Sequence, residues 1–142
     1  MKRLIQTAGW LSLALLMSAC VDSGPPIDVV AQQADEYMEA LKNHDYDKAF
    51  SFYSPEFFTT RPREAWRDYL KNAADKLGPM KSFRLAHKRK DTRFSGIFYV
   101  FVYKTEYAND NAHETVTFVY PIDSKELKIF AHHIDAGVLK AN

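Results

Sequence analysis

Two side chains of this sequence could exchange a proton with a substrate. Glu114 and His133 each alternate with apolar residues in a strand-like stretch, which predicts that both point inward, near Tyr37 and Trp66. A carboxylate and an imidazole in an apolar pocket can act as general acid and base, because burial shifts their pKa values. The alternative is a glutamate and a histidine satisfied by hydrogen bonds at the rim of a sheet, and we expect this arrangement. These four residues are therefore a candidate pocket, and we assign no catalytic residue.

The sequence carries no other motif for a metal or a cofactor. His113 and Glu114 begin like the zinc motif His-Glu-x-x-His, but Thr117 stands where the second histidine is required. His132 and His133 are neighbours on a predicted strand and point to opposite faces, so they cannot bind one ion together. The five glycines are scattered, which excludes a phosphate-binding loop, and no Gly-x-Ser-x-Gly elbow occurs. We expect neither a metal nor a cofactor.

Aromatic side chains in one strand indicate a binding surface. One face of the predicted strand 97–107 carries Tyr99, Phe101, Tyr103 and Tyr107. The other face carries Phe98, Val100 and Val102, so both faces are apolar and one needs a cover of further protein, a ligand or a partner. Tyrosine is common at binding surfaces, so we predict that the aromatic face binds a protein partner or a second copy of the chain. The alternative is that long strands curl until the chain itself buries both faces.

The N-terminal segment predicts a lipid anchor. Residues 1–19 join a positive start at Lys2 and Arg3 to an apolar stretch that is too short and interrupted to span a bilayer comfortably. The stretch ends in Leu16-Met17-Ser18-Ala19-Cys20, which resembles the lipobox of bacterial lipoproteins. That resemblance implies cleavage before Cys20 and attachment of diacylglycerol and palmitate to it. Cys20 is the only cysteine, and lipidation explains an unpaired cysteine in an exported protein. An uncleaved anchor helix is the alternative.

The residues after Cys20 predict where the domain lies. By resemblance to lipoprotein sorting in Gram-negative bacteria, the neutral Val21 implies the outer membrane, facing the periplasm, with the inner membrane as the alternative. Residues 20–26 form the lipidated cysteine and a short tether, of which 21–26 spans at most ~20 Å. A basic run at 87–90, with Arg93 beyond it, is predicted in a hairpin connection. We expect a solvated loop there; contact with anionic lipid headgroups is the alternative.

The composition is typical of one globular domain. The chain has 142 residues, of which 26% are charged and 46% hydrophobic, and this profile excludes disordered, collagen-like and disulfide-scaffold chains. Without residues 1–19, the chain keeps 17 basic and 18 acidic residues. Nucleic-acid binders are strongly basic, so we expect no nucleic-acid partner.

Apolar spacing predicts helices first and strands afterwards. Helical periodicity covers 27–43, a short segment from 45 to 53, and 62–77, with Phe57 and Phe58 in a loop between the last two. Alternation then predicts strands at 81–87, 97–107, 114–120 and 127–134. Short connections favour an antiparallel meander. The predicted fold is one α+β domain at 27–135, with three N-terminal helices packed on a curved four-stranded antiparallel sheet and a tail at 136–142.

The order of these elements resembles the nuclear-transport-factor-2-like superfamily, also called cystatin-like. The pieces His44-Asp45-Tyr46-Asp47-Lys48-Ala49, the helix from Trp66 to Gly78, the aromatic strand after Gly96 and Glu114-Thr115-Val116-Thr117 are similar to an exported bacterial family of unknown function within it. The resemblance covers residues 27–135 and implies a cone-shaped α+β barrel with a conical pocket. The superfamily includes isomerases, dehydratases and cyclases as well as binding and assembly modules, so the fold leaves the function open.

Together these observations predict a membrane-anchored periplasmic lipoprotein whose domain binds an apolar ligand or a protein partner without catalysis. One alternative is a pocket enzyme of the isomerase or dehydratase type that uses acid and base residues. Such an enzyme needs an enclosed cavity with two titratable groups within hydrogen-bond reach. A second alternative is a structural subunit of an envelope assembly.

Overall fold

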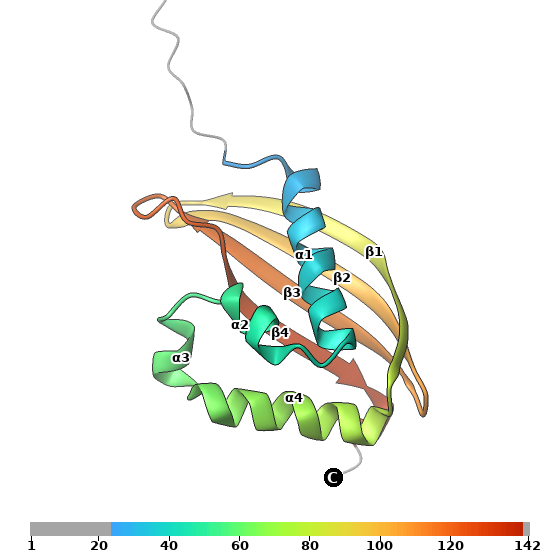
Figure 1. Ribbon diagram of the computed structural model, residues 1–142. Coiled ribbons are helices and arrows are strands. Elements are labelled where there is room, and N and C mark those ends of the chain that lie inside the picture. Colours follow the sequence, from blue (N-terminus) through green and yellow to red (C-terminus); the bar gives the residue numbers. More distant parts are fainter. Residues whose placement is uncertain (1–23, 141–142) are drawn as a thin grey trace, which may run out of the picture.

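The computed structural model describes residues 24–140, so the predicted signal segment and Cys20 lie outside the described residues. Helices come first along the chain and strands follow (Figure 1). The helices are α1 (Ile27–Lys42), α2 (Tyr46–Ser51), α3 (Phe57–Thr60) and α4 (Arg63–Leu77). The strands are β1 (Met80–Arg93), β2 (Gly96–Tyr107), β3 (Asn111–Pro121) and β4 (Lys128–Ala136), followed by a short 3₁₀ turn at Gly137–Leu139. The predicted α+β class is confirmed.

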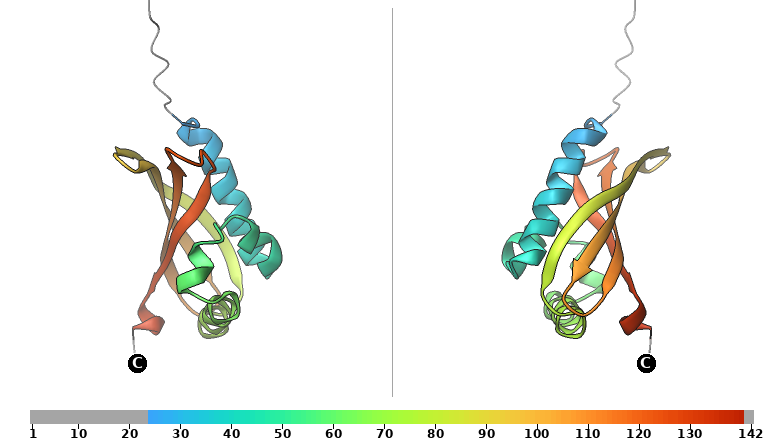
Figure 2. Two further views of the ribbon diagram at one scale, coloured as in Figure 1. Left: turned by 90° about the vertical axis from the view of Figure 1, so that its left-hand side faces the viewer. Right: turned by 90° about the vertical axis from the view of Figure 1, so that its right-hand side faces the viewer.

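The strands form one antiparallel sheet in the order β1-β2-β3-β4, which confirms the predicted meander. The sheet is strongly curved, and the helices gather on its concave side (Figure 2). In this part of the chain β1 and β4 are the two edges, so the sheet is open and the predicted barrel is not confirmed. None of the helices in residues 24–140 combines the length and the apolar composition that crossing a bilayer requires.

Local sequence signals explain where the helices begin and end. Pro26, with φ −57°, precedes α1, and the Asp45 carboxylate accepts the backbone N–H of Lys48 at 3.1 Å at the start of α2. Gly78 ends α4 in the left-handed region at φ 80°. A side chain there would meet Ala108, because an added Cβ would lie 2.8 Å from the Cβ of that residue.

The structure has one more helix before the sheet than the sequence predicts. α3 is a single turn that contains Phe57 and Phe58, which the sequence places in a loop. The turn begins where the Ser54 hydroxyl accepts the backbone N–H of Phe57 at 3.3 Å. Both rings pack on Tyr53, at centroid distances of 4.4 and 5.6 Å, so aromatic contacts with the core hold this short segment.

The first strand is longer than the alternation predicts. β1 continues to Arg93, because the two residues Phe94 and Ser95 suffice to connect it to β2. The prediction that the basic run at 87–90 lies in a hairpin connection is therefore wrong. These residues lie on an edge strand, where only one side of the backbone is paired and charged side chains reach solvent.

The aromatic face of β2 is part of the core, so the prediction that it binds a partner is wrong. Tyr99, Phe101 and Tyr103 are fully buried, and Tyr107 is 7% exposed. The helices cover this concave side of the sheet, and the tyrosine hydroxyls find acceptors there. The Tyr99 hydroxyl donates to the Pro25 carbonyl and the Tyr103 hydroxyl to Asp35 Oδ1, both at 2.7 Å. Tyrosine suits this core because its hydroxyl reaches polar groups at the helix side.

Candidate functional site

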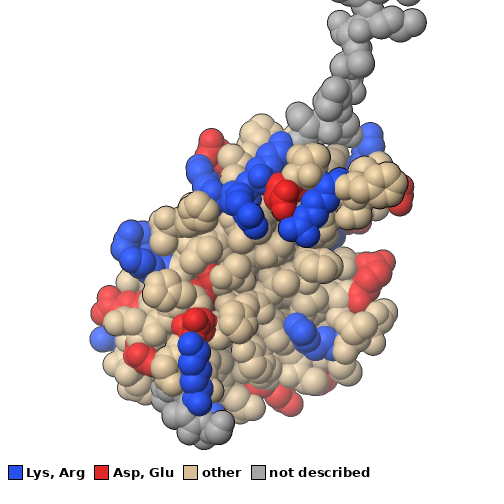
Figure 3. All heavy atoms as spheres, turned by 180° about the vertical axis from the view of Figure 1, so that it is seen from behind, with Lys and Arg blue, Asp and Glu red and all other residues tan. Residues whose placement is uncertain are grey.

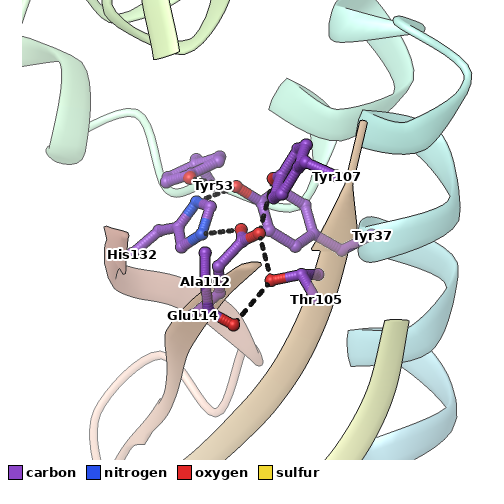
Figure 4. A network of polar contacts seen from close by, with 7 residues as sticks. All are labelled: Tyr37, Tyr53, Thr105, Tyr107, Ala112, Glu114 and His132. Carbon is purple, nitrogen blue, oxygen red and sulfur yellow. Dashed lines mark hydrogen bonds and ion pairs between the residues drawn. The ribbon is translucent and has the colours of Figure 1, made fainter. Parts of the chain in front are cut away.

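A polar network lies at the centre of the concave face, between the sheet and α1 (Figure 4). Glu114 on β3 is fully buried, and His132 on β4 is 5% exposed. The Glu114 Oε2 atom lies 2.8 Å from the His132 Nε2 atom. Buried charged groups are rare in proteins unless they are paired, so this pair is the strongest candidate for a site in the described residues.

The histidine of this network is not the one that the alternation predicts. His133 is exposed, and His132 is the inward residue. The reason is an extra residue in β4: Thr117 pairs with Ala131 and Phe118 with Ile129, which leaves Phe130 without a partner. This bulge reverses the alternation, so the prediction for His133 is wrong.

A signal for the correct histidine is present further along the strand. Ile134 and Ala136 are apolar and alternate with the polar His133 and Asp135. Counting back from Ile134 in steps of two places His132 on the apolar face, whereas counting forward from Ile129 crosses the bulge and fails. The structure brings Tyr37, Trp66 and Glu114 to the same region, as predicted, with the Trp66 ring 6.3 Å from the ring of His132.

Two hydroxyl groups bind the second carboxylate oxygen of Glu114. The Tyr107 hydroxyl donates to Oε1 at 2.5 Å, and the Thr105 hydroxyl lies 2.8 Å from the same atom. Thr105 is also 3.2 Å from the carbonyl oxygen of Ala112. Thr105 is a residue that the sequence analysis misses, although its position between Tyr103 and Tyr107 on the inner face of β2 marks a polar side chain inside the core.

The network continues from His132 toward the helices. His132 Nδ1 lies 2.9 Å from the Tyr37 hydroxyl, which lies 2.7 Å from the Tyr53 hydroxyl. His132 Nε2 therefore contacts the Glu114 carboxylate, while the Tyr37 hydroxyl links His132 Nδ1 to the Tyr53 hydroxyl. The carboxylate accepts three hydrogen bonds in this arrangement.

The surroundings fix the charge state of these groups. Burial alone would raise the pKa of the Glu114 carboxyl, but the hydrogen bond and the electrostatic attraction of His132, together with the hydrogen bonds from Tyr107 and Thr105, lower it below its usual value. Burial raises the pKa values of Tyr37, Tyr53 and Tyr107. Glu114 is therefore ionised and the three tyrosines are neutral donors at neutral pH.

A small cavity and an open groove border the network. A cavity of about 30 Å³ borders Glu114 and Tyr107, with Leu41, Leu70 and Ile134 among its other walls. This volume is that of about one water molecule. An open groove of about 400 Å³ between α4 and β4 includes Trp66, His132 and His133 in its wall. Within residues 24–140, no group of three or more histidine, cysteine, aspartate or glutamate side chains is arranged to hold a metal ion.

The fold and the family of this chain are established by comparison with known proteins. The chain belongs to the family described as "Protein of unknown function (DUF4019)", whose model matches residues 33–126. The matched segment ends before His132. It includes the other five residues of the network, which are Tyr37, Tyr53, Thr105, Tyr107 and Glu114. No curated protein matches the chain.

Among solved structures, the chain is similar to "Structure of Bdellovibrio bacteriovorus Bd1075". The TM-score is 0.52 and the sequence identity 18%, over 75% of this chain and 39% of that chain. At this identity the likeness concerns the fold alone. Because the match covers 39% of the Bdellovibrio protein, the present chain spans less than half of its length.

Proposed function

We propose that this protein is a membrane-anchored periplasmic lipoprotein whose domain binds another protein and does not catalyse a reaction. The observation that carries the proposal is the convex face of the sheet, which we call the outer face. It consists of Phe98, Val100, Val102, Thr115, Thr117, Val119, Phe130 and Ala131. No helix or strand in residues 24–140 covers it, although five of these eight side chains are apolar and larger than alanine. A contiguous apolar surface of this kind is typical of an interaction site.

Two phenylalanine side chains lie in the apolar centre of the outer face. The ring of Phe130 is 58% exposed and contacts the edge of Phe98, at a centroid distance of 5.8 Å. The bulge that turns His132 inward is also what places Phe130 outward, because the unpaired residue of a bulge leaves the regular alternation. Figure 3 shows this side of the molecule with a broad uncharged centre and charged groups toward its edges.

Basic residues at one end of the outer face indicate the chemistry of the partner. Arg89 pairs in register with Val100 and Lys128 with Val119, while the Arg93 guanidinium lies 4.9 Å from the Phe98 ring centroid. A protein surface with an apolar strip and acidic groups beside it is complementary to this arrangement. A second copy fits less well, because two copies anchored in one membrane would bring their basic ends together.

The polar network supports a role without catalysis. Both oxygens of Glu114 and both ring nitrogens of His132 already have partners within the protein, and the adjacent cavity holds about one water molecule. A general acid or base must instead reach a substrate atom. This enclosed cavity is too small for an apolar ligand, and the groove of about 400 Å³ beside α4 is open to solvent, which favours a protein partner. We regard the network as a structural element that fixes β3 and β4 against α1.

The anchor and the superfamily belong to the same proposal. The lipobox-like sequence before Cys20 supports lipidation, and Val21 supports the outer membrane. The curved antiparallel sheet with helices on its concave side supports a nuclear-transport-factor-2-like domain. The small size of the cavity supports a domain of this kind that is filled by its own side chains.

The mass of the protein extracted from membranes in mild detergent tests this proposal. We expect light scattering to show a complex of the lipoprotein with a second protein, and Phe130→Asp to reduce it to a single lipoprotein chain. Tyr69→Asp is the control, because Tyr69 is also an exposed large apolar side chain but lies on α4, away from the outer face. The proposal is wrong if the wild-type protein is a single chain, or if both variants lose the complex equally. A complex of two identical chains would contradict the inference that the basic end of the outer face selects an acidic partner.

A further inference from the structure

Three segments meet at the end of the domain where the described chain begins, as Figures 1 and 2 both show. They are residues 24–29, residues 88–95 at the β1–β2 connection and residues 122–128 at the β3–β4 connection, and we call them the tether end. The backbone N–H of Ile122 donates to the Ser95 carbonyl at 3.5 Å, which brings the two connections together. The hydrogen bond from the Tyr99 hydroxyl to Pro25 fixes the first segment on the same end.

The tether end exposes large apolar side chains. Phe94 is 99% exposed, Ile122 58% and Val29 45%. The two other exposed large apolar residues in the described part of the chain are Tyr69 and Phe130. A fully exposed phenylalanine at the tip of a hairpin contributes nothing to the core, but it can insert among lipid headgroups, where aromatic side chains are favoured.

Basic side chains lie in the same segments as these exposed apolar residues. The tether end contains six basic and four acidic residues, whereas the rest of the chain from Cys20 onward contains 11 basic and 14 acidic residues. Lys88 is paired with Asp28, Arg93 with Asp91 and Lys128 with Glu126, so at least three of the six basic side chains are balanced locally. Figure 3 shows Lys and Arg side chains gathered next to the point where the grey trace leaves the domain. The molecule therefore presents a positive end.

The tether holds this end near its anchor. Gly24 has φ 60°, and an added Cβ there would lie 2.8 Å from Ile97 Cδ1 and from the Tyr99 hydroxyl, so the chain leaves the domain from a tightly packed position. Cys20 is only four residues earlier, at most ~14 Å of extended chain. An acyl group on Cys20 would keep the tether end within about one to two Debye lengths of the lipid headgroups.

We propose that the tether end docks on a bilayer that contains anionic phospholipid, with Phe94 and Ile122 among the headgroups and the basic residues of 88–93 next to the phosphates. This inference rests on the proposed function, because the anchor at Cys20 selects the end that faces the membrane. Docking directs Arg89 and Arg93, at the basic end of the outer face, toward the lipid, and it leaves the apolar centre of that face and Lys128 open to a partner. Each basic residue near an anionic surface strengthens binding about fivefold.

The test uses the lipoprotein reconstituted into vesicles, with a polarity-sensitive thiol dye on Phe94→Cys. Asn109→Cys, in the exposed β2–β3 turn at the opposite end, is the control. Acylated Cys20 does not react with the dye, so the introduced cysteine is the single labelled site. In vesicles with phosphatidylglycerol we expect the dye at 94 to shift to shorter wavelength and to be quenched by brominated lipid, and the dye at 109 to do neither.

A pair of charge variants tests the electrostatic part. The double variant Arg89→Gln with Lys90→Gln should reduce quenching of the dye at 94 in phosphatidylglycerol vesicles. If each charge strengthens binding about fivefold, the ratio of docked to free protein falls about 25-fold. Lys81→Gln with Arg84→Gln, at the other end of the same strand, should leave quenching unchanged.

The docking proposal is overturned if the dye at 94 stays in water, or if it is quenched equally in phosphatidylcholine and phosphatidylglycerol vesicles. Mass spectrometry of the same preparation separates this failure from failure of the proposed function. An unmodified Cys20 overturns both proposals, whereas an acylated Cys20 with the dye at 94 in water overturns docking alone.

Discussion

Among single residues, Glu114 is a carboxylate that the fold keeps ionised in its core. Glu114 is fully buried, yet hydrogen bonds from His132, Tyr107 and Thr105 lower its pKa. Taking a charge out of water is costly, and three donors offset that cost. The sequence could predict that Glu114 points inward, because it alternates with apolar residues. It could not predict the full set of donors, since Thr105 and Tyr107 lie on another strand.

Replacing Glu114 with glutamine tests the role of this charge. At pH 7 we expect Glu114→Gln to lower the free energy of unfolding by about 2–3 kcal/mol, because hydrogen bonds to a charged group are lost. The pKa of Glu114 is lower in the folded than in the unfolded protein, so its stabilisation is complete above the unfolded pKa of about 4.3. It disappears as the pH falls through the folded pKa.

Urea unfolding at pH 7 and in acid should therefore show the difference between wild type and Glu114→Gln narrowing below about pH 4. Glu106→Gln, an exposed position on β2, is the control and should follow the wild type. A difference that stays constant with pH would show that the carboxylate is not what stabilises the network.

The two adjacent histidines give a matched test of the bulge in β4. His132→Asn should lower the free energy of unfolding by about 2–3 kcal/mol, because it breaks contacts with both Glu114 and Tyr37. His133→Asn should change it by less than about 0.5 kcal/mol, because this side chain is exposed. Equal effects in chemical denaturation would contradict the register of β4.

At the scale of the elements, the sequence predicts the long periodic segments well. The helices at α1 and α4 and the four strands follow from spacing, since Pro26, Pro62 and Gly78 mark helix boundaries by their backbone preferences. The single turn of α3 does not follow, because tertiary aromatic contacts hold it. Nor could the sequence decide which face of β2 is covered, since both faces are apolar and only the position of the helices distinguishes them.

The two faces of β2 can be compared directly. Phe101 is fully buried against Phe118, so Phe101→Ala should lower the free energy of unfolding by about 3–5 kcal/mol. Val100→Thr, one residue earlier on the outer face, should cost less than about 1 kcal/mol because it creates no cavity in the core. Thermal unfolding of both variants checks this, and a larger loss for Val100→Thr would reverse the assignment of the faces.

At the scale of the whole molecule, the parts have separate roles. The concave face and its polar network are filled and satisfied by the chain itself. The tether end carries apolar tips and basic side chains, and the outer face carries the apolar surface that the described helices leave uncovered. A domain docked at its tether end would hold this outer face sideways above the membrane. That orientation suits a partner that is itself at the membrane surface.

Site-specific photo-crosslinking in intact cells tests the central claim, which is that the outer face binds a protein. A photo-reactive amino acid at Phe130 should give an adduct with one protein, and Val100→Asp in the same chain should abolish that adduct by placing a charge in the apolar centre. The same probe at Asn72, an exposed position on α4, should give none. The account is contradicted if position 130 gives no adduct, or if positions 130 and 72 give the same adducts.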